Sequence, residues 1–458
     1  MKRVKWLLLL AVLAAACAGG LAAGRLTSGR RLAGVGAFAP SAERDAVSFS
    51  GSYDTGTRTL RGRQTMTLTN RSGEALSQIV LRLVMNGEDP DAVAVSGVQI
   101  GGRDAAFAGD GDDPTLLRVQ TDWRAGETIA LSFTVMIRCA KTDGAALITL
   151  PMLDVTEDGA WRADAWDALA GPGMAQAFDC TIDALEVQRG MQAVYGGDLT
   201  AMSESDGTVR YTAQMQGARD VTFALLQDGC VRQAEAQGVL VTAMAAGSAR
   251  ARVLLARTGE ALSSLERIGL SYPFASLTVV QAALPRADGA AYSGLIALES
   301  QDDGEQLLRR ITRLVARESF GVLVGVDPWR APWLSESLAS AAELLAYRAR
   351  KGEAAFETRF FEEIEPATRL TRPYGVCVGA GVAQFGSDAE MTQVLRDQGA
   401  AMLLGIGMAA GEEALAEALC RYAEENAGQM ASREALERAL QAATGSAWDG
   451  YLTDGLAD

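Results

Sequence analysis

The segment RLVARESFGVLVGVDPWRAPWLSE, residues 313–336, contains basic and acidic side chains at a spacing that could form a site. Arg313 and Arg317 are four positions apart, so on a helix they would project from one face. Glu336 follows Arg317 after 18 intervening residues. A guanidinium stays protonated and has no lone pair to offer a metal ion, but it pairs well with a carboxylate. Helix periodicity alone allows a simpler interpretation, in which the two arginines belong to a solvated basic face.

The chain contains no histidine, which limits the chemistry available to it. Without an imidazole it cannot build a Ser-His-Asp triad, a Cys-His pair or a His-ligated metal site. None of its cysteines has CxxC-type spacing, so neither a zinc ribbon nor a dithiol redox motif is predicted. Apart from Cys17 near the N-terminus, an odd number remains, and we expect most of these to be buried thiols: Cys139, Cys180, Cys230, Cys377 and Cys420.

Length and composition indicate a folded protein of two or three domains. The chain has 458 residues, of which 48% are hydrophobic and 22% are charged. Its formal net charge is −15, from 57 acidic and 42 basic residues. Nucleic-acid-binding proteins carry basic surfaces, so this balance argues against a nucleic-acid partner.

The N-terminal segment MKRVKWLLLLAVLAAACAGGLAAG, residues 1–24, has a basic start followed by an apolar run. This pattern predicts a signal peptide or a membrane anchor, and therefore an extracytoplasmic location in the cell envelope. The apolar run extended through Ala23 reaches 18 residues, which is the lower limit for a membrane-spanning helix. Cys17 follows LAAA, a poor lipidation signal, so cleavage, lipid attachment and a transmembrane anchor all stay open.

Residues 46–238 have the alternating pattern of half-buried β-strands. In TIALSFTVMIR, residues 128–138, every second side chain from Ile129 to Ile137 is large and apolar. Gly- and Asp-rich clusters such as NGEDPD and AGDGDDP punctuate these strands as turns. We therefore predict a β-sandwich domain over residues 46–238, preceded by a linker at residues 25–45.

Near residue 245 the hydrophobic period becomes helical, and residues 239–455 are predicted to form a mainly α-helical domain. In EQLLRRITRLVARESF, residues 305–320, one face is apolar through Leu307, Ile311, Leu314 and Val315. The opposite face carries arginines. The predicted fold class is thus α+β in two domains.

Six sets of segments occur in an order that resembles a known enzyme family. They are SYDTGTRTLRGRQTMTLTNRSGEAL, AFDCTIDA with YGGDLTA, SYPFASLTVVQ, GAAYSGLIALES, VGVDPWRAPWLSESLA and GEEALAEALCRYAEENAG. Together they resemble the landmarks of the aminopeptidase N (membrane alanyl aminopeptidase) family of gluzincin zinc metallopeptidases. The resemblance covers roughly residues 46–455. It implies an aminopeptidase N-like β-sandwich followed by a thermolysin-like, mainly helical domain with a small sheet.

The resemblance also implies a zinc site, because the family binds zinc through HExxH and a glutamate on the next helix. Two histidines at i and i+4 converge on the ion, and the glutamate between them is the general base. In this sequence Arg313 and Arg317 stand at the histidine positions and Leu314 stands at the general base. Glu336 retains the carboxylate of the third ligand.

Two further positions of the family pattern have changed. The strand glutamate that holds a substrate's free amine falls at Ala291, and the tyrosine that stabilises the oxyanion falls at Arg396. Tyr374 leaves this second assignment open. The asparagine and glycine that flank the metal segment are replaced by Val326 and Ser337.

The resemblance therefore implies a non-catalytic homologue that lacks zinc and binds a peptide or protein partner. We expect Arg317, together with Arg313, to pair with Glu336 and to connect the two helices where the family holds its metal. The alternative is an active hydrolase with an unrecognised site, for example one based on serine and lysine. The sequence does not indicate an oligomeric state.

Overall fold

The computed structural model describes residues 44–142, 144–167, 176–205, 207–284, 289–299, 301–369 and 376–457. The predicted leader, nearly all of the predicted linker, and Tyr374 lie outside these ranges. Within them, no helix combines the length and apolar character needed to cross a membrane.

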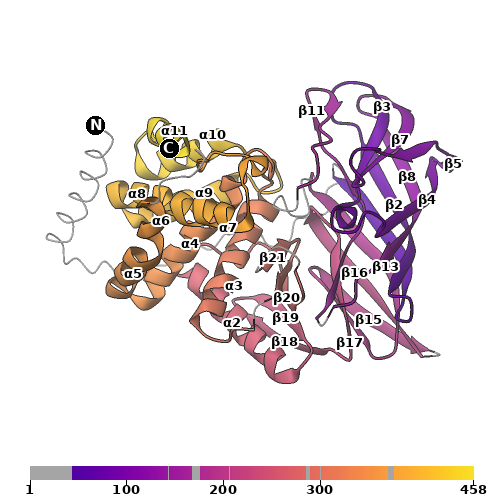
Figure 1. The fold of residues 1–458 in the computed structure, drawn as a ribbon, viewed down its shortest axis with the longest axis horizontal. Helices are drawn as coiled ribbons and strands as arrows, with labels where there is room; N and C mark the ends of the chain where they lie inside the picture. Colours follow the sequence, from indigo (N-terminus) through magenta and orange to yellow (C-terminus); the bar gives the residue numbers. More distant parts are fainter. Residues whose placement is uncertain are drawn as a thin grey trace.

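The N-terminal part of the chain is built of β-sheets, which lie at one end of the molecule (Figure 1). Its largest sheet has the strand order β15-β16-β13-β1-β2-β8-β4-β5. Neighbouring strands are antiparallel except for β1 and β13, which run parallel. The strands are β1 (Asp45–Asp54), β2 (Thr59–Thr69), β4 (Val93–Ile100), β5 (Arg103–Asp104), β8 (Thr128–Arg138), β13 (Phe178–Gln188), β15 (Asp198–Ser205) and β16 (Thr208–Ala218).

Two smaller sheets face this large sheet and complete a sandwich. One has the order β10-β3-β7-β6 and the other β14-β17-β9, while β11 and β12 form a separate hairpin. The core between the layers joins residues of both faces, as in the ring contact of Phe49 with Phe223 at a centroid distance of 6.4 Å. The elements are β3 (Leu76–Arg82), η1 (Val84–Gly87), β6 (Phe107–Gly109), β7 (Leu116–Trp123), β9 (Ala146–Thr149), β10 (Met152–Leu153), β11 (Thr156–Glu157), β12 (Ala160–Trp161), β14 (Met191–Tyr195) and β17 (Thr222–Gln227).

A five-stranded sheet begins the second part of the chain, in the order β18-β19-β20-β22-β21. Its strands are β18 (Cys230–Ala236), β19 (Val239–Ala245), β20 (Ser276–Gln281), β21 (Gly289–Tyr292) and β22 (Leu295–Leu298). The first of these lies before residue 238, where the sequence places the domain boundary. Because β18 forms an antiparallel hairpin with β19, it belongs to the second sheet and not to the sandwich.

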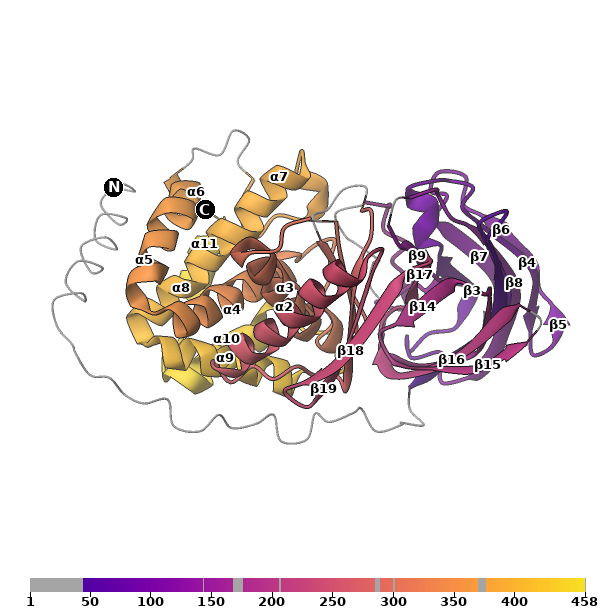
Figure 2. The ribbon, with the colours of Figure 1, turned by 90° about the horizontal axis from the view of Figure 1, so that it is seen from below.

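Helices cover this sheet and form the opposite end of the molecule from the sandwich (Figures 1 and 2). The α-helices are α2 (Ser248–Glu266), α3 (Glu305–Arg317), α4 (Trp333–Lys351), α5 (Glu353–Arg359), α6 (Glu365–Arg369), α7 (Asp388–Met391), α8 (Gly399–Ala410), α9 (Glu412–Glu425), α10 (Arg433–Thr444) and α11 (Asp449–Ala457). The π-helical turns are η3 (Glu318–Leu323), η4 (Phe360–Ile364) and η6 (Thr392–Gln398), and η5 (Val382–Gln384) is a 3₁₀ turn.

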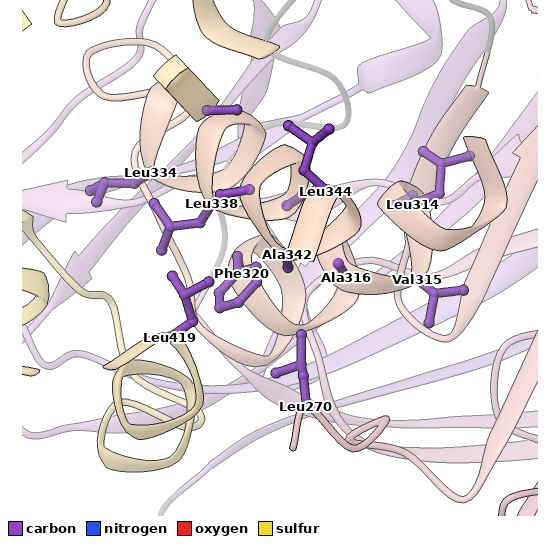
Figure 3. Close-up of a cluster of buried hydrophobic side chains, with 14 of the residues drawn as sticks. Leu270, Leu314, Val315, Ala316, Phe320, Leu334, Leu338, Ala342, Leu344 and Leu419 are labelled. Carbon is purple, nitrogen blue, oxygen red and sulfur yellow. The ribbon is translucent and has the colours of Figure 1, made fainter. Parts of the chain in front are cut away.

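Burial in these elements follows the two hydrophobic periods of the sequence. In β8, Leu131, Phe133, Val135 and Ile137 have no exposed surface, while the residues between them reach solvent. In α3 the predicted apolar stripe is buried, and Leu314 packs in one cluster with Phe320, Leu338 and Leu419 (Figure 3). The α+β architecture, with a β-rich region followed by a helical region that contains a small sheet, is thus confirmed.

Buried Arg219 joins the sandwich to the helical part. It follows β16, and its guanidinium donates to the carbonyl oxygens of Val322 at 2.6 Å and Gln429 at 2.9 Å. A Cβ atom at Gly325 would lie 2.5 Å from Cζ of this arginine, so the glycine makes room for it. Burial lowers the pKa of Arg219 to about 10, which shows that desolvation of its charge is costly.

We expect Arg219→Met to lower the free energy of unfolding by about 2–4 kcal/mol, because buried carbonyl oxygens lose their donor. Chemical denaturation of the full-length protein measures this change. Arg210→Met, at an exposed position of the preceding strand β16, serves as the control and should change stability by less than about 0.5 kcal/mol. Equal stability of the two variants would show that Arg219 does not connect the two parts.

Candidate functional site

The candidate site lies where α3, α4 and η6 meet. Arg313 and Arg317 occupy the last two turns of α3. Glu336 lies in the first turn of α4, a helix that begins directly after Pro332. Arg396 comes from η6. A Cβ atom at Gly399 would lie 2.1 Å from Oγ of Ser337, so a glycine is required for this close approach to α4.

The carboxylate of Glu336 contacts three guanidinium groups. Nε of Arg317 lies 3.0 Å from Oε1 of Glu336, and Nε of Arg396 lies 2.9 Å from Oε2. Nη1 of Arg313 lies 3.4 Å from the same Oε2. The Glu336 side chain is only 4% exposed, and those of the arginines are 10–18% exposed. We call these four residues the Glu336 cluster.

The electrostatics of the Glu336 cluster favour the ionised acid. Burial by itself would raise the pKa of Glu336, but the charges of Arg317, Arg396 and Arg313 outweigh it and hold the pKa far below its ordinary value. The carboxylate is therefore charged at neutral pH. The expected pairing of Arg317 and Arg313 with Glu336 is present, and Arg396 is an additional partner.

Leu314 and Ala291 belong to the same buried hydrophobic cluster of the helical part. Leu314 is fully buried, and its Cδ1 would lie 2.6 Å from a Cβ atom at Gly289 on β21. Ala291 lies on the same strand and is 5% exposed. Neither side chain can accept or transfer a proton. The predicted positions of the general base and of the amine-binding acid therefore contribute packing in this structure.

The donor set of the Glu336 cluster does not fit a zinc ion. Three of its four side chains are protonated guanidinium groups without a lone pair, and they surround the single carboxylate with positive charge. In the part of the chain that the structure describes, no group of three or more Cys, Asp and Glu side chains could hold a metal. The residues present therefore do not fit the metal that the resemblance implies.

A pocket of about 300 Å³ opens beside the Glu336 cluster and is lined by Arg313 and Arg396. Other charged side chains of its wall pair with one another. Arg359 lies 2.6 Å from Glu343, and Arg309 is paired with Glu363. The lining also contains Asp397, next to Arg396 in the sequence.

Two further buried acids, Glu318 at the end of α3 and Asp220, were not predicted from the sequence. Glu318 directly follows Arg317 and accepts a hydrogen bond from the backbone N–H of Gly294 at 3.0 Å. Oδ2 of Asp220, in the sandwich, accepts from the N–H of Ser293 at 2.8 Å. Burial raises the pKa of Glu318 well above its ordinary value, and the negative charge of Asp220 adds to this effect. An acid directly before the apolar segment SFGVLV was the available signal.

The two tryptophans of the segment 313–336 contribute packing. Trp329 and Trp333 are buried, and Nε1 of Trp329 donates to the carbonyl oxygen of Ala165 at 3.1 Å, so Trp329 lies between the two parts of the molecule. The five described cysteines are free thiols. Only Cys139 and Cys180 are buried, whereas Cys230, Cys377 and Cys420 are partly exposed, so the expectation that most of the cysteines are buried is wrong.

No family model matches the sequence, and no curated protein matches it. Solved structures do resemble the fold. An M1 zinc metallopeptidase from Deinococcus radiodurans has a TM-score of 0.63 at 19% identity, covering 90% of this chain and 93% of that one. A glutamate-to-alanine variant of a two-domain M1 zinc metallopeptidase bound to L-arginine has a TM-score of 0.64 at 21% identity, with the same coverage. A similar variant bound to L-tryptophan reaches 0.64 at 18% identity and covers 93% of this chain and 98% of that one.

These similarities are too low in identity to transfer residues or activities, but they extend over both parts of the molecule. The predicted resemblance is thereby confirmed at the level of architecture. The chain has the fold of the two-domain M1 zinc metallopeptidases, and it carries the Glu336 cluster within that fold.

We expect Glu336→Gln to destabilise the protein by about 3–5 kcal/mol, because it removes the charge of a buried carboxylate that contacts three guanidinium groups. Arg317→Met should cost less, since Arg313 and Arg396 still neutralise the acid. Thermal and chemical unfolding of both variants and of the double variant give the coupling energy, expected to be about 1–3 kcal/mol. Glu417→Gln, which removes an exposed ion pair on α9, is the control and should cost less than about 1 kcal/mol. A coupling energy near zero would contradict the cluster.

The raised pKa of Glu318 predicts that the free energy of unfolding depends on pH. The folded state retains a proton that the unfolded state releases, so stability falls as the pH rises above the ordinary carboxyl pKa of about 4.3 toward the raised value. The slope for one group is at most about 1.4 kcal/mol per pH unit. Glu318→Gln keeps an acceptor for Gly294 and should flatten this decline, so that the variant gains stability relative to the unmodified protein at pH 8. Glu235→Gln, at an exposed position of β18, should leave the slope unchanged.

Proposed function

We propose that this protein is a non-catalytic relative of the M1 zinc metallopeptidases and that it binds a peptide or protein partner. The observation that carries the proposal is the Glu336 cluster, in which guanidinium groups take the positions assigned to the metal ligands. The ion pairs that connect α3, α4 and η6 would serve the structural role of a metal without its Lewis acidity.

The residues at the other catalytic positions of the family support the same conclusion. A metallopeptidase needs a general base to activate water and a group to stabilise the oxyanion. Leu314 and Arg396 stand at those positions in the resemblance. Leu314 cannot act as a base, and Arg396 is already paired with Glu336. Ala291 offers no carboxylate to a substrate amine.

The alternative of a serine and lysine hydrolase finds little support in the described lysines. A lysine acts as a base when burial lowers its pKa. Lys141 is exposed, and Lys351 is 42% exposed and lies 3.2 Å from Glu305. Neither of these two side chains is buried, so neither meets the condition for a lysine base.

We further propose that the protein is exported and held at the membrane by residues 1–24. The basic start and the apolar run of the sequence support this proposal. An extracytoplasmic binding protein with a net charge of −15 would meet peptides and proteins rather than nucleic acids. Determining the N-terminus of the protein recovered from membrane and soluble fractions distinguishes cleavage from anchoring.

We expect the purified full-length protein to contain no stoichiometric zinc and to show no chelator-sensitive hydrolysis of fluorogenic aminoacyl substrates. The reason is that none of the three arginines of the Glu336 cluster can ligate the ion. Elemental analysis and the peptidase assay measure the two quantities. One zinc ion per chain would contradict the proposal, and chelator-resistant hydrolysis would favour the alternative.

Redesigned variants provide a matched positive control. The triple variant R313H/L314E/R317H restores the HExxH pattern, but Arg396 still lies beside Glu336 and competes for its carboxylate. Adding R396Y removes this competitor, so the quadruple variant should bind zinc more tightly than the triple variant. Zinc content is the readout, because hydrolysis is expected to stay low without an acid at position 291.

A further inference from the structure

Two buried acids bind one turn at the junction between the sandwich and the helical part. Asp220 lies between β16 and β17 of the sandwich, and Glu318 directly follows α3. Oδ2 of Asp220 accepts a hydrogen bond from the backbone N–H of Ser293 at 2.8 Å. Glu318 accepts one from the backbone N–H of Gly294 at 3.0 Å. Because these two amides are consecutive, the turn between β21 and β22 binds one acid from each part of the molecule.

The turn and the sandwich touch through their backbones. A Cβ atom at Gly196, which follows β14, would overlap the carbonyl oxygen of Ser293. A Cβ atom at Gly294 would overlap the carbonyl oxygen of Gly196 in the same way. Oε1 of Glu318 is buried and accepts no hydrogen bond within the part of the chain that the structure describes. An ionised carboxylate at this place can therefore be hydrated only if the two backbones move apart.

Burial raises the pKa of both acids. For Glu318, the charge of Asp220 raises the pKa further, whereas the charge of Arg317 lowers it by a smaller amount. For Asp220, burial outweighs the hydrogen bonds from Thr222 and Ser293, which lower the pKa. In the closed junction both acids therefore keep their protons to a higher pH than exposed carboxyl groups do.

The other ionisable groups that interact with this pair do not change charge near neutral pH. Burial raises the pKa of four of them, which stay protonated: Cys180, Tyr195, Tyr272 and Tyr292. The pKa of Arg219, next to Asp220, is lowered by burial to about 10, so this arginine stays charged at pH 8. Of all these groups, Asp220 and Glu318 are the ones that can ionise as the pH rises from 5 to 8.

We propose that the sandwich and the helical part separate at this turn as the pH rises, because the carboxylates of Asp220 and Glu318 require water that the closed junction excludes. The two negative charges also repel one another. The closed state binds protons that the open state releases, so each acid favours opening by up to about tenfold per pH unit above about pH 4. This inference concerns how the two parts are joined, and it does not depend on the proposed function.

The separation is a local opening and not an unfolding of the chain. It breaks the hydrogen bond from Ser276 to the carbonyl oxygen of Gly196, at 2.9 Å, because that oxygen lies on the sandwich side of the turn. The apolar core inside the sandwich is a separate cluster from the core of the helical part, so each part keeps its own packing. The ion pair of Arg162 with Asp327 and the chain itself keep the two parts connected.

The test is amide hydrogen exchange of the full-length protein, followed by mass spectrometry at pH 5, 6.5 and 8. Protection factors remove the intrinsic pH dependence of exchange. Residues 289–299 report on the turn, and β8 reports on the core of the sandwich. We expect the protection of the turn to fall about tenfold or more from pH 5 to 8, while that of β8 changes less than about threefold. Constant protection of the turn, or an equal fall in both segments, overturns the proposal.

Variants assign the opening to the two acids. Glu318→Gln and Asp220→Asn keep an oxygen acceptor for the turn but cannot ionise, so each should reduce the pH dependence of its protection. The double variant should keep at pH 8 the protection that the unmodified protein has at pH 5. Glu235→Gln, at an exposed position of β18, is the control and should behave like the unmodified protein. The single variants decide the test if the double variant does not fold. An unchanged pH dependence in both of them would reject these acids as its cause.

Discussion

One buried carboxylate and its three arginines connect α3, α4 and η6 in the helical part of this protein. Glu336 is almost inaccessible to water, and an isolated charge in that position would be strongly unfavourable. Arg313 and Arg317 compensate it from α3, and Arg396 compensates it from η6. The three elements must stay close together for the charge to be tolerated. The ion pairs of the cluster thus hold the three elements together. They are strong because little water screens them, and the planar guanidinium groups set their geometry.

The cluster also changes the chemical character of the M1-like fold. A metal centre presents a Lewis acid to a substrate, whereas a guanidinium presents a hydrogen-bond donor of fixed charge. In the proposed function, the same backbone frame would bind a partner and would not cleave a bond. This distinction cannot be read from the structural similarity, which extends over about 90% of the chain at roughly 20% identity and reports architecture. The side chains at a few positions decide the chemistry.

Buried polar groups recur where the sandwich meets the helices. Arg219 donates to backbone carbonyls of the helical part, and Arg162 pairs with Asp327 at 2.5 Å. Glu318 and Asp220 accept backbone hydrogen bonds from the turn between β21 and β22. The segment that follows α3 is therefore held by specific hydrogen bonds and charges as well as by apolar packing. Such contacts fix the position of the Glu336 cluster relative to the sandwich.

The sequence by itself determined the broad architecture and the pairing of Arg317 with Glu336. Periodicity is local, so the alternation in β8 and the stripe of α3 could be read directly, as could the absence of histidine. The tertiary structure alone decided that β18 pairs with β19, because the sequence of a strand does not specify which strand it pairs with. It alone brought Arg396 to Glu336 across 59 intervening residues and set Glu318 near Asp220. These contacts depend on how α4 and η6 pack, and that packing is a property of the whole core.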